Sequence, residues 1–458
     1  MTLSSKTRST ARPDATGYLE RACLLLLAGL VLGGCVRETR QATEPDVAIS
    51  LPELVLEPID EGLPRNGLWV GTLSVLPHGL SGDDPPALLS APARKSGKGP
   101  VLYSLKQGHA WRQISCEFPP RPYDYGPTLA GDLTGDGALE IVLGAHLRGL
   151  AVLESAHGDS GCRWTDIDRG LPTGIRSAPP VSVGALALTP DAGGPPWLWV
   201  LPDIPSGRTD IRGLRAFRYE DDHWKTIALN EAIGSKTGAG LATGRWIGEQ
   251  WLIVASRIIN DRSVLLTQTM SEWSFAPIKG WPVFDRLFHD AVGTRRLENG
   301  RQAPLLSYRY AHDKQWFRRL VQLNRDDDGN WQQQILSETA TRTPFTALAG
   351  ANLPGADSGE DIIAATKDGA WHMFRQLFRQ SATGFEQRVE PAPAWRRGCQ
   401  ARSIEAVDIV GDLHDELIVN YATDPPAYDF TRPCPSNGGI EAWRIRPPFA
   451  SMDASSKK

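Results

Sequence analysis

The segment from Leu129 to Ala145, LAGDLTGDGALEIVLGA, contains the pattern that decides the fold. A strand of small residues leads into a turn rich in Gly and Asp, and a strongly apolar strand follows the turn. The same outline returns near the C-terminus as IEAVDIVGDLHDELIVNYA, from Ile404. A fixed period of this length is the signature of a repeat architecture. The seven units start every 50 to 60 residues or so, the weaker copies being those from Trp69, Val183, Gly240, Val292 and Thr346.

The second half of each unit repeats as well. A third strand leads to a polar turn, and in six units an aromatic residue then opens a fourth strand. The turns before these residues, such as EDDH at 220–223 and DDDGN at 326–330, have the Asp and Gly chemistry of tight hairpins. Four antiparallel strands per unit describe a propeller blade, so we predict an all-β, seven-bladed β-propeller over residues 54–449. The recurring aromatic residues are Trp111, Trp164, Trp224, Trp273, Trp331 and Phe385.

The seventh unit lacks a fourth strand, because GGIEAWRIRP is followed by a polar tail, which we expect to be disordered over 450–458. The missing strand is found at the other end of the fold. Leu54 to Glu57, followed by IDEGLP, matches TDIDRGLP at 165–172 and, more loosely, FAPIKGWP at 275–282. We therefore predict that the N-terminal strand completes the last blade, which removes an exposed sheet edge.

The first 34 residues have the character of a signal peptide. Four basic residues precede the apolar run ACLLLLAGLVL at 22–32, which at eleven residues is too short for a membrane span of about 20 residues. The run LGGC from Leu32 to Cys35 resembles the lipobox of bacterial lipoproteins. That resemblance implies that Cys35 becomes the lipidated N-terminus, whereas an ordinary signal peptide with an incidental cysteine is the alternative.

Residues 35–53 are polar and non-periodic, which predicts a flexible tether between the lipid and the fold. Val36 follows the cysteine at the position where inner-membrane retention usually carries Asp. We therefore expect a lipoprotein anchored in the outer membrane and facing the periplasm or the cell exterior.

Charge and cysteine content narrow the class of function. The chain has 49 basic and 53 acidic residues, and removal of four basic and two acidic leader residues leaves 45 and 51, a net charge of −6. This balance predicts no nucleic-acid partner. Four cysteines follow Cys35, and an even count in an oxidising compartment favours disulfides. Cys399 and Cys434 flank the first strands of the seventh unit, so we pair them; the remaining pair would join Cys116 and Cys162 on neighbouring blades.

The motif D-x-x-G-D-G-x-x-E-I-V from Asp132 to Val142 resembles the FG-GAP, or VCBS, repeat family, whose members are β-propellers. The acidic loop of this family often holds calcium, and oxygen donors at alternate positions suit that hard cation. A loop closed by the hydrogen bonds of its own Asp side chain is the alternative. In the copy at Asp408 one donor and the glycine are replaced, which argues against calcium there. The resemblance implies a calcium site at Asp132, Thr134, Asp136 and Glu140.

The linkers that join one blade to the next should meet on one face of the ring, and each carries at least one cation. Arginine and lysine interleaved with aromatic residues would suit carboxylated or phosphorylated sugars, because Arg binds such groups bidentately. Surface loops that are simply rich in Arg are the alternative. The candidate ligand-binding cations are Arg176, Lys236, Arg286, Arg342 and Arg402.

The candidates for acid–base chemistry are His289, because a histidine side chain ordinarily titrates near neutrality and Asp285 and Asp290 lie close to it in sequence, and Tyr125 in another linker. The sequence contains no G-x-S-x-G and no H-E-x-x-H motif. We therefore predict a membrane-anchored, extracytoplasmic binding or scaffolding lipoprotein whose ligand is an anionic glycan or a partner protein. A secreted polysaccharide lyase or glycoside hydrolase of propeller fold is the alternative.

Overall fold

The structure is a computed structural model, and it divides the chain into two units, Met1–Leu51 and Pro52–Lys458. All described residues lie in the second unit. The predicted signal peptide, tether and C-terminal tail lie outside the described residues. No helix in the described part of the chain is long and apolar enough to cross a membrane. The structure describes residues 54–67, 69, 71–79, 84–91, 100–106, 110–114, 125–137, 139–145, 149–153, 169–171, 182–191, 194–203, 213–234, 238–256, 260–269, 272–355, 359–379, 382–394, 396–423, 434 and 437–447.

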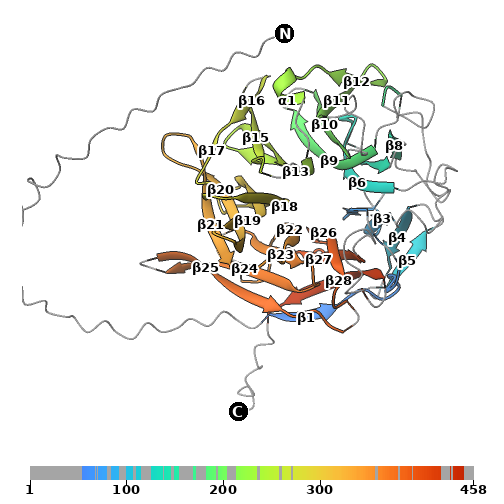
Figure 1. Ribbon diagram of the computed structural model, residues 1–458. Coiled ribbons are helices and arrows are strands. Elements are labelled where there is room, and N and C mark those ends of the chain that lie inside the picture. The colour runs from blue at the N-terminus through green and yellow to red at the C-terminus, as the bar shows by residue number, and fades with distance from the viewer. Residues whose placement is uncertain are drawn as a thin grey trace, which may run out of the picture. The chain divides into compact units, whose positions relative to one another are not determined.

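Seven sheets of antiparallel neighbours follow one another around a ring (Figure 1), and we number them as blades 1 to 7 in chain order. Blade 1 contains β2 (Leu73–Leu76), β3 (Ala87–Ser90), β4 (Val101–Leu105) and β5 (Trp111–Ile114). The described strands of blade 2 are β6 (Tyr125–Gly131), β7 (Glu140–Ala145) and β8 (Gly149–Leu153). Blade 3 contains β9 (Ser182–Asp191), β10 (Gly194–Asp203), β11 (Arg215–Glu220) and β12 (His223–Ile227). The short helix α1 (Glu231–Gly234) follows it.

The remaining blades follow the same order. Blade 4 contains β13 (Gly238–Trp246), β14 (Glu249–Ser256), β15 (Val264–Thr269) and β16 (Glu272–Ala276). Blade 5 contains β18 (Arg286–Arg296), β19 (Gln302–His312), β20 (Gln315–Arg325) and β21 (Trp331–Thr339), with β17 (Ile278–Lys279) parallel to β21. Blade 6 contains β22 (Phe345–Ala351), β23 (Asp361–Thr366), β24 (Trp371–Arg379) and β25 (Ala382–Glu390). Blade 7 contains β26 (Gln400–Val407), β27 (Glu416–Ala422), β28 (Gly438–Arg446) and β1 (Val55–Pro58).

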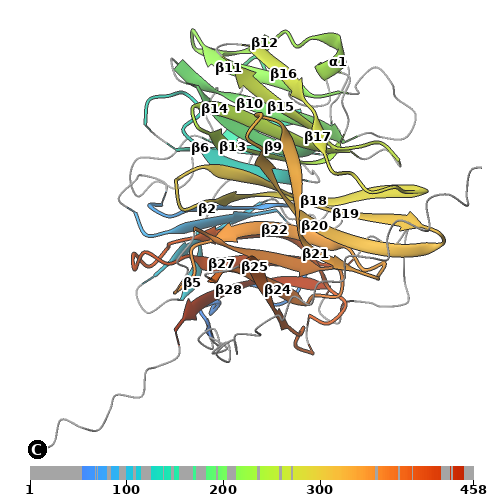
Figure 2. The ribbon, with the colours of Figure 1, turned by 90° about the vertical axis from the view of Figure 1, so that its left-hand side faces the viewer.

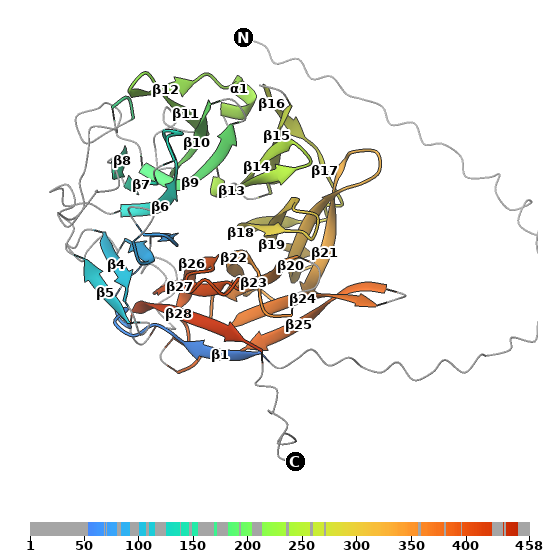
Figure 3. The same ribbon diagram turned by 180° about the vertical axis from the view of Figure 1, so that it is seen from behind.

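The prediction of a seven-bladed, all-β propeller is confirmed, and so is the closing strand. β1 pairs antiparallel with β28, with Val55 opposite Arg446 and Pro58 opposite Trp443. The last blade is therefore built from both ends of the fold, as Figure 3 shows where the first strand lies beside β28. This pairing covers the outer edge of β28, which would otherwise expose unpaired backbone groups.

The repeated IDEGLP sequence has a structural cause. The backbone N–H of Trp111 donates to the carbonyl of Glu61 at 2.7 Å, and the Trp111 indole N–H donates to the carbonyl of Ile59 at 2.9 Å. Gly62 has a φ of +86°, and a Cβ there would lie 2.0 Å from the Trp111 oxygen. The second copy repeats the contact, because a Cβ on Gly170 would lie 2.2 Å from the oxygen of Trp224. The turn that follows one blade is thus hydrogen-bonded to the tryptophan in the fourth strand of the next blade.

The small residues at the start of each unit allow the innermost strands to approach closely. Figures 1 and 3 show the first strand of each sheet toward the middle of the ring. Hydroxyl groups join these strands across blades: Thr243 Oγ1 donates to Leu188 O at 2.9 Å, and Thr294 Oγ1 donates to Thr243 O at 3.0 Å. A Cβ on Gly293 would lie 2.7 Å from Leu348 O, so a larger residue would separate two blades.

The hydrophobic core lies between neighbouring blades. Trp331, for example, packs with residues of blades 4 and 5, including Ile253 and Leu306. The aromatic residues that were predicted to open the fourth strands are buried or partly buried in the described blades, and Trp164 lies outside the described residues. Burial of apolar surface in this way stabilises the fold by roughly 25 cal/mol per Å².

Among the described strands, the longest belong to blade 5. Its strands β18, β19 and β20 each have 11 residues, whereas β22 and β23 of blade 6 have 7 and 6. At about 3.3 Å per residue, 11 residues span about 36 Å. Figure 2 shows the ends of β18, β19 and β20 extending beyond the other blades. The turn at the end of the β19–β20 hairpin is formed by Asp313 and Lys314, both at positive φ.

Candidate functional site

The Asp132 loop is closed by its own hydrogen bonds. Asp132 accepts the backbone N–H of Gly135 at 2.7 Å on one oxygen and that of Gly137 at 3.0 Å on the other. Glu140 accepts the backbone N–H of Leu133 at 2.6 Å. Burial raises the pKa of the Glu140 carboxyl to about 7. Both carboxylates are therefore engaged with the loop itself.

The loop at Asp408 repeats this arrangement. Its Asp408 carboxylate accepts the backbone N–H groups of Gly411 and Leu413, and Glu416 accepts that of Ile409. Within the described residues, no group of three or more His, Cys, Asp or Glu side chains is placed to hold a metal ion. The carboxylates of both loops accept backbone N–H groups of their own loop. The calcium site at Asp132 therefore stays a prediction.

His289 is held by the preceding blade. Its Nε2 donates to the backbone carbonyl of Asp261 at 2.9 Å, because a carbonyl oxygen only accepts hydrogen bonds. The other ring nitrogen of the neutral side chain, Nδ1, therefore accepts the Ser263 hydroxyl at 2.8 Å. Burial lowers the pKa of His289 to about 4. The ring also contacts Trp281 edge-on, with 5.6 Å between the centroids. Both ring nitrogens are thus used to join blades 4 and 5.

The two aspartates near His289 in sequence have other partners. Asp285 accepts the backbone N–H of Asp313 at 3.2 Å, and Asp290 binds Arg309 through both carboxylate oxygens, at 2.8 to 3.0 Å. Burial raises the pKa of Asp290 to about 6, and the Arg309 charge opposes the rise. The structure therefore does not bring these groups together as an acid–base pair. Tyr125 opens β6, and its side chain lies outside the described part.

One face of blade 5 brings arginines and aromatic rings together, and we call it the blade-5 face. Phe288, Arg309 and Arg318 are directly paired across β18, β19 and β20, and directly paired residues share a face of a sheet. Trp316 is two residues before Arg318 on the same strand, which places it on the same face. Arg342 reaches the face from the linker between β21 and β22. The blade-5 face consists of Phe288, Arg309, Trp316, Arg318, Arg342 and Phe345.

Each arginine of this face is stacked on a ring. The guanidinium carbon of Arg318 lies 3.8 Å from the ring centroid of Phe345, that of Arg342 lies 5.4 Å from Trp316, and that of Arg309 lies 5.8 Å from Phe288. Stacking fixes the plane of a guanidinium, and an anion binds at its N–H edge, which on Arg309 is already occupied by Asp290.

The three guanidinium groups gather at one short linker. Arg309 Nη1 donates to the carbonyl of Arg342 at 3.0 Å, and Arg318 Nη1 donates to the carbonyl of Thr343 at 3.2 Å. Phe288 and Trp316 are partly buried, and Arg342 is exposed. Because Phe345 opens β22, the blade-5 face is directed toward blade 6.

Two of the five predicted ligand-binding cations are on or beside this face: Arg342 belongs to it, and Arg286 is exposed at the start of β18, two residues from Phe288. Arg402 lies apart on β26, where it donates to the carbonyl of Thr423 at 3.3 Å. Arg176 and Lys236 lie outside the described residues.

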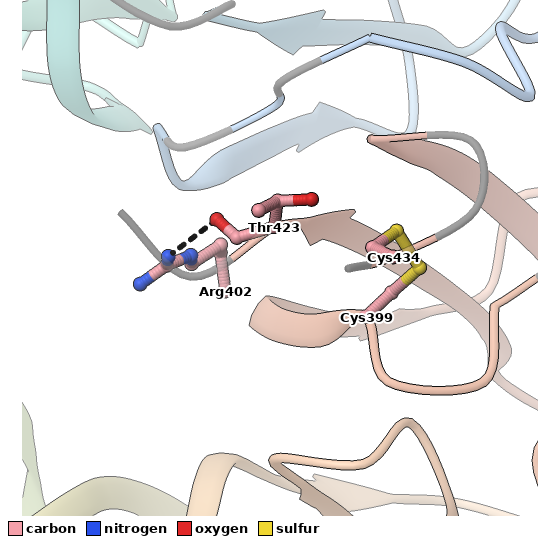
Figure 4. Close-up of a disulfide and its surroundings, with 4 residues drawn as sticks. All are labelled: Cys399, Arg402, Thr423 and Cys434. Carbon is pink, nitrogen blue, oxygen red and sulfur yellow. Dashed lines mark hydrogen bonds between the residues drawn. A yellow bond between two sulfur atoms is a disulfide. The ribbon is translucent and has the colours of Figure 1, made fainter. Parts of the chain in front are cut away.

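The predicted disulfide between Cys399 and Cys434 is confirmed, with 4.5 Å between the Cα atoms. Figure 4 shows it beside Arg402, whose side chain points away from the sulfur atoms. The bridge joins the segment before β26 to the segment before β28, within blade 7. Cys116 and Cys162 lie outside the described residues.

Sequence analysis missed Phe288, Arg309, Trp316, Arg318 and Phe345. For Arg309, Trp316 and Arg318 the signal was present as the run SYRYAHDKQWFRRL from Ser307, in which Arg and aromatic residues flank a tight turn. The unusual length of this hairpin could have marked it as the part of the ring that extends beyond its neighbours.

No protein-family model matches the chain, and no curated protein sequence matches it. Among solved structures, the crystal structure of BBS1N in complex with ARL6DN is similar, with a TM-score of 0.47 and 11% identity over 88% of this chain and 98% of that chain. The extracellular domains 1–2 of Drosophila semaphorin 1a give a TM-score of 0.46 and 10% identity over 85% and 88%. The chain's own seven sheets define its class, a seven-bladed β-propeller.

Proposed function

We propose that this chain is an exported, lipid-anchored binding or scaffolding protein whose ligand docks on the blade-5 face. The observation that carries the proposal is the difference in length between blades 5 and 6. The ends of β18, β19 and β20 extend beyond the other blades, and the face there contains three guanidinium groups close to aromatic rings, of which that of Arg342 is exposed. Function in rigid scaffolds is concentrated in such local elaborations rather than in the repeated framework.

The composition of the face supports a binding role. Arg and aromatic residues are enriched in the centres of protein interfaces, whereas Lys, Glu and Asp are depleted there. The six residues of the blade-5 face are three arginines and three aromatic residues. Arg286 adds a further exposed cation beside them. An anionic ligand, whether a glycan or a protein, fits this charge.

The anchoring part of the proposal rests on the leader, the LGGC run and the polar tether. The D-x-x-G-D-G motif supports a place in the FG-GAP group of secreted propellers. Cys35→Ala should move the protein from the membrane fraction to the soluble fraction of the cell. A Cys35→Ala protein that stays unprocessed in the membrane fraction would rule out lipidation at this residue.

The docking part is tested by co-purification of the chain with its ligand from cells. The double variant Phe288→Ala with Trp316→Ala removes the partly buried rings of the face and should abolish recovery of a component that the parent recovers. Phe275→Ala with Val389→Ala is the matched control, because these residues are 40% and 50% exposed on blades 4 and 6. Equal recovery by all three proteins, at equal melting temperature, would refute docking on this face.

A further inference from the structure

Arg318 is a buried cation without a carboxylate partner. Only 6% of its surface is exposed, and its one hydrogen bond within the described residues is the bond to the Thr343 carbonyl. Its buried Nε has no acceptor there. Burial lowers the pKa of Arg318 to about 10, and the more distant Asp368 and Asp290 oppose the fall. A buried charge without a partner is costly, so a docked anion would offset that cost.

The neighbouring arginines differ in their pairing. Arg309 is neutralised by Asp290, which lies 2.8 Å from its Nη2. Arg342 is exposed, stacks on Trp316, and makes no ion pair within the described part of the chain. Arg318 and Arg342 are therefore the two cations of the face whose charge is left for a ligand, and both are oriented by a ring before any ligand arrives. Such preorganisation lowers the entropy cost of binding.

We infer that Arg318 and Arg342 bind carboxylate side chains from an acidic segment of a partner protein. This inference rests on the proposed docking at the blade-5 face and adds the chemistry of the partner. A carboxylate can accept two N–H groups from the edge of one guanidinium, and charge-assisted bonds of this kind are about twice as strong as neutral ones.

A protein is favoured over an acidic polysaccharide by an exposed aliphatic side chain beside the face. Val283, in the segment that leads into β18, is 77% exposed. Aliphatic side chains of a partner can cover Val283, whereas a pyranose ring stacks on aromatic rings but has no aliphatic side chain with which to cover an isolated valine. The stacked arginines beside aromatic rings are also the residue types that dominate binding energy in protein interfaces.

The probe for this inference is a random peptide library displayed on phage and selected against the full chain. Selected peptides should be enriched in Asp and Glu relative to the input library. Their affinity should fall at least about tenfold in Arg342→Gln and in Arg318→Gln. Arg342 is exposed, so its variant reports on binding even if Arg318→Gln folds poorly. Arg245→Gln, which removes an exposed arginine from blade 4, should leave the affinity unchanged.

A second readout is the titration of His372 by NMR. This residue contacts Phe345, with 5.1 Å between the ring centroids, and its Nδ1 lies 2.6 Å from Gln387 Nε2. Burial and then the Arg318 charge lower the pKa of His372 to about 4, while Asp368 opposes the shift. A carboxylate bound to Arg318 should raise the His372 pKa in the parent and leave it unchanged in Arg318→Gln. A purely structural Arg318 would give no change on peptide addition.

The outcomes separate this inference from the proposed function. Peptides that lose affinity in Trp316→Ala but contain no excess of acidic residues would overturn the inference and leave docking on the blade-5 face intact. Polygalacturonate that binds in an Arg342-dependent way, with no acidic peptide selected, would replace the protein partner by a glycan. Peptides indifferent to Trp316→Ala and to both arginine variants would overturn the inference and the docking site together.

Discussion

Substitution of Gly62 by Ala should destabilise the contact between the turn after the closing strand and Trp111 of blade 1. Gly62 follows the closing strand, and its φ of +86° lies in a region that costs a residue with a side chain about 1–2 kcal/mol. The added Cβ would also lie 2.0 Å from the Trp111 oxygen, which is backbone and cannot rotate away. The turn must therefore separate from blade 1.

The separation would cost the two hydrogen bonds that Trp111 makes to this turn, at 2.7 and 2.9 Å. Each such bond contributes about 0.5–1.5 kcal/mol. With the backbone term, we expect Gly62→Ala to lower the free energy of unfolding by about 2–5 kcal/mol.

Gly137→Ala is the matched control for this experiment. Gly137 has a similar φ, +90°, but a Cβ there would have no heavy atom within 4 Å. Its loss should therefore be limited to the backbone term of about 1–2 kcal/mol. Guanidinium-induced unfolding of the parent and both variants gives the comparison through their midpoints. Equal losses of unfolding free energy in the two variants would refute the stabilising role of the contact between Gly62 and Trp111.

Three further predictions concern the ring, the histidine and the acidic loop. Deletion of residues 51–60 removes β1 and should produce an unstable or aggregating protein in size-exclusion chromatography; a stable monomer would contradict the closing strand. The pKa of His289 is about 4 in the folded chain, whereas its ordinary value is 6.5. Between these pH values only the unfolded chain is protonated at this residue, so the free energy of unfolding should fall as pH falls from 6.5 to about 4. His289→Gln should remove this pH dependence, which amounts to at most about 3 kcal/mol in the free energy of unfolding, as measured by unfolding at several pH values. The calcium prediction requires a higher melting temperature in calcium than in chelator, with no such difference in Asp136→Ala; identical curves for the parent would refute it.

The repeated framework could be predicted because each blade solves the same packing problem. The close approach of innermost strands requires small residues, such as Gly293, and the turn before Trp111 requires a glycine at position 62. These requirements recur with the period of the blade, so they leave a periodic trace in the sequence. The closing strand was predictable for the same reason, because it repeats a contact made at Gly170.

The grouping of His289 with Asp290 illustrates what the sequence could not show. Successive residues of a strand point to opposite faces of the sheet, so residues adjacent in sequence are poor candidates for a shared site. Asp290 accordingly pairs with Arg309, whereas His289 is held by Ser263 and Asp261 of the preceding blade.

The blade-5 face could not be predicted, because it depends on the relative lengths of two neighbouring blades, which the sequence of one repeat does not show. Arg318 meets Phe345 only because blade 5 extends past the beginning of blade 6. The lengths of two neighbouring hairpins decide this overhang, and strand boundaries are the least certain part of a sequence-based prediction. Local sequence could predict the hairpin at Asp313 but not what its strands would face.

Photo-crosslinking in living cells would test docking at the blade-5 face most directly. A photoreactive phenylalanine analogue in place of Trp316 should form a covalent adduct with the docked ligand on illumination. The same analogue at Val389, an exposed position on β25 that is 50% accessible, should form none. An adduct at position 316 that disappears in Arg342→Gln is the result that we predict. Adducts of equal yield at both positions, or an adduct at 389 alone, would contradict the assignment of function to this face.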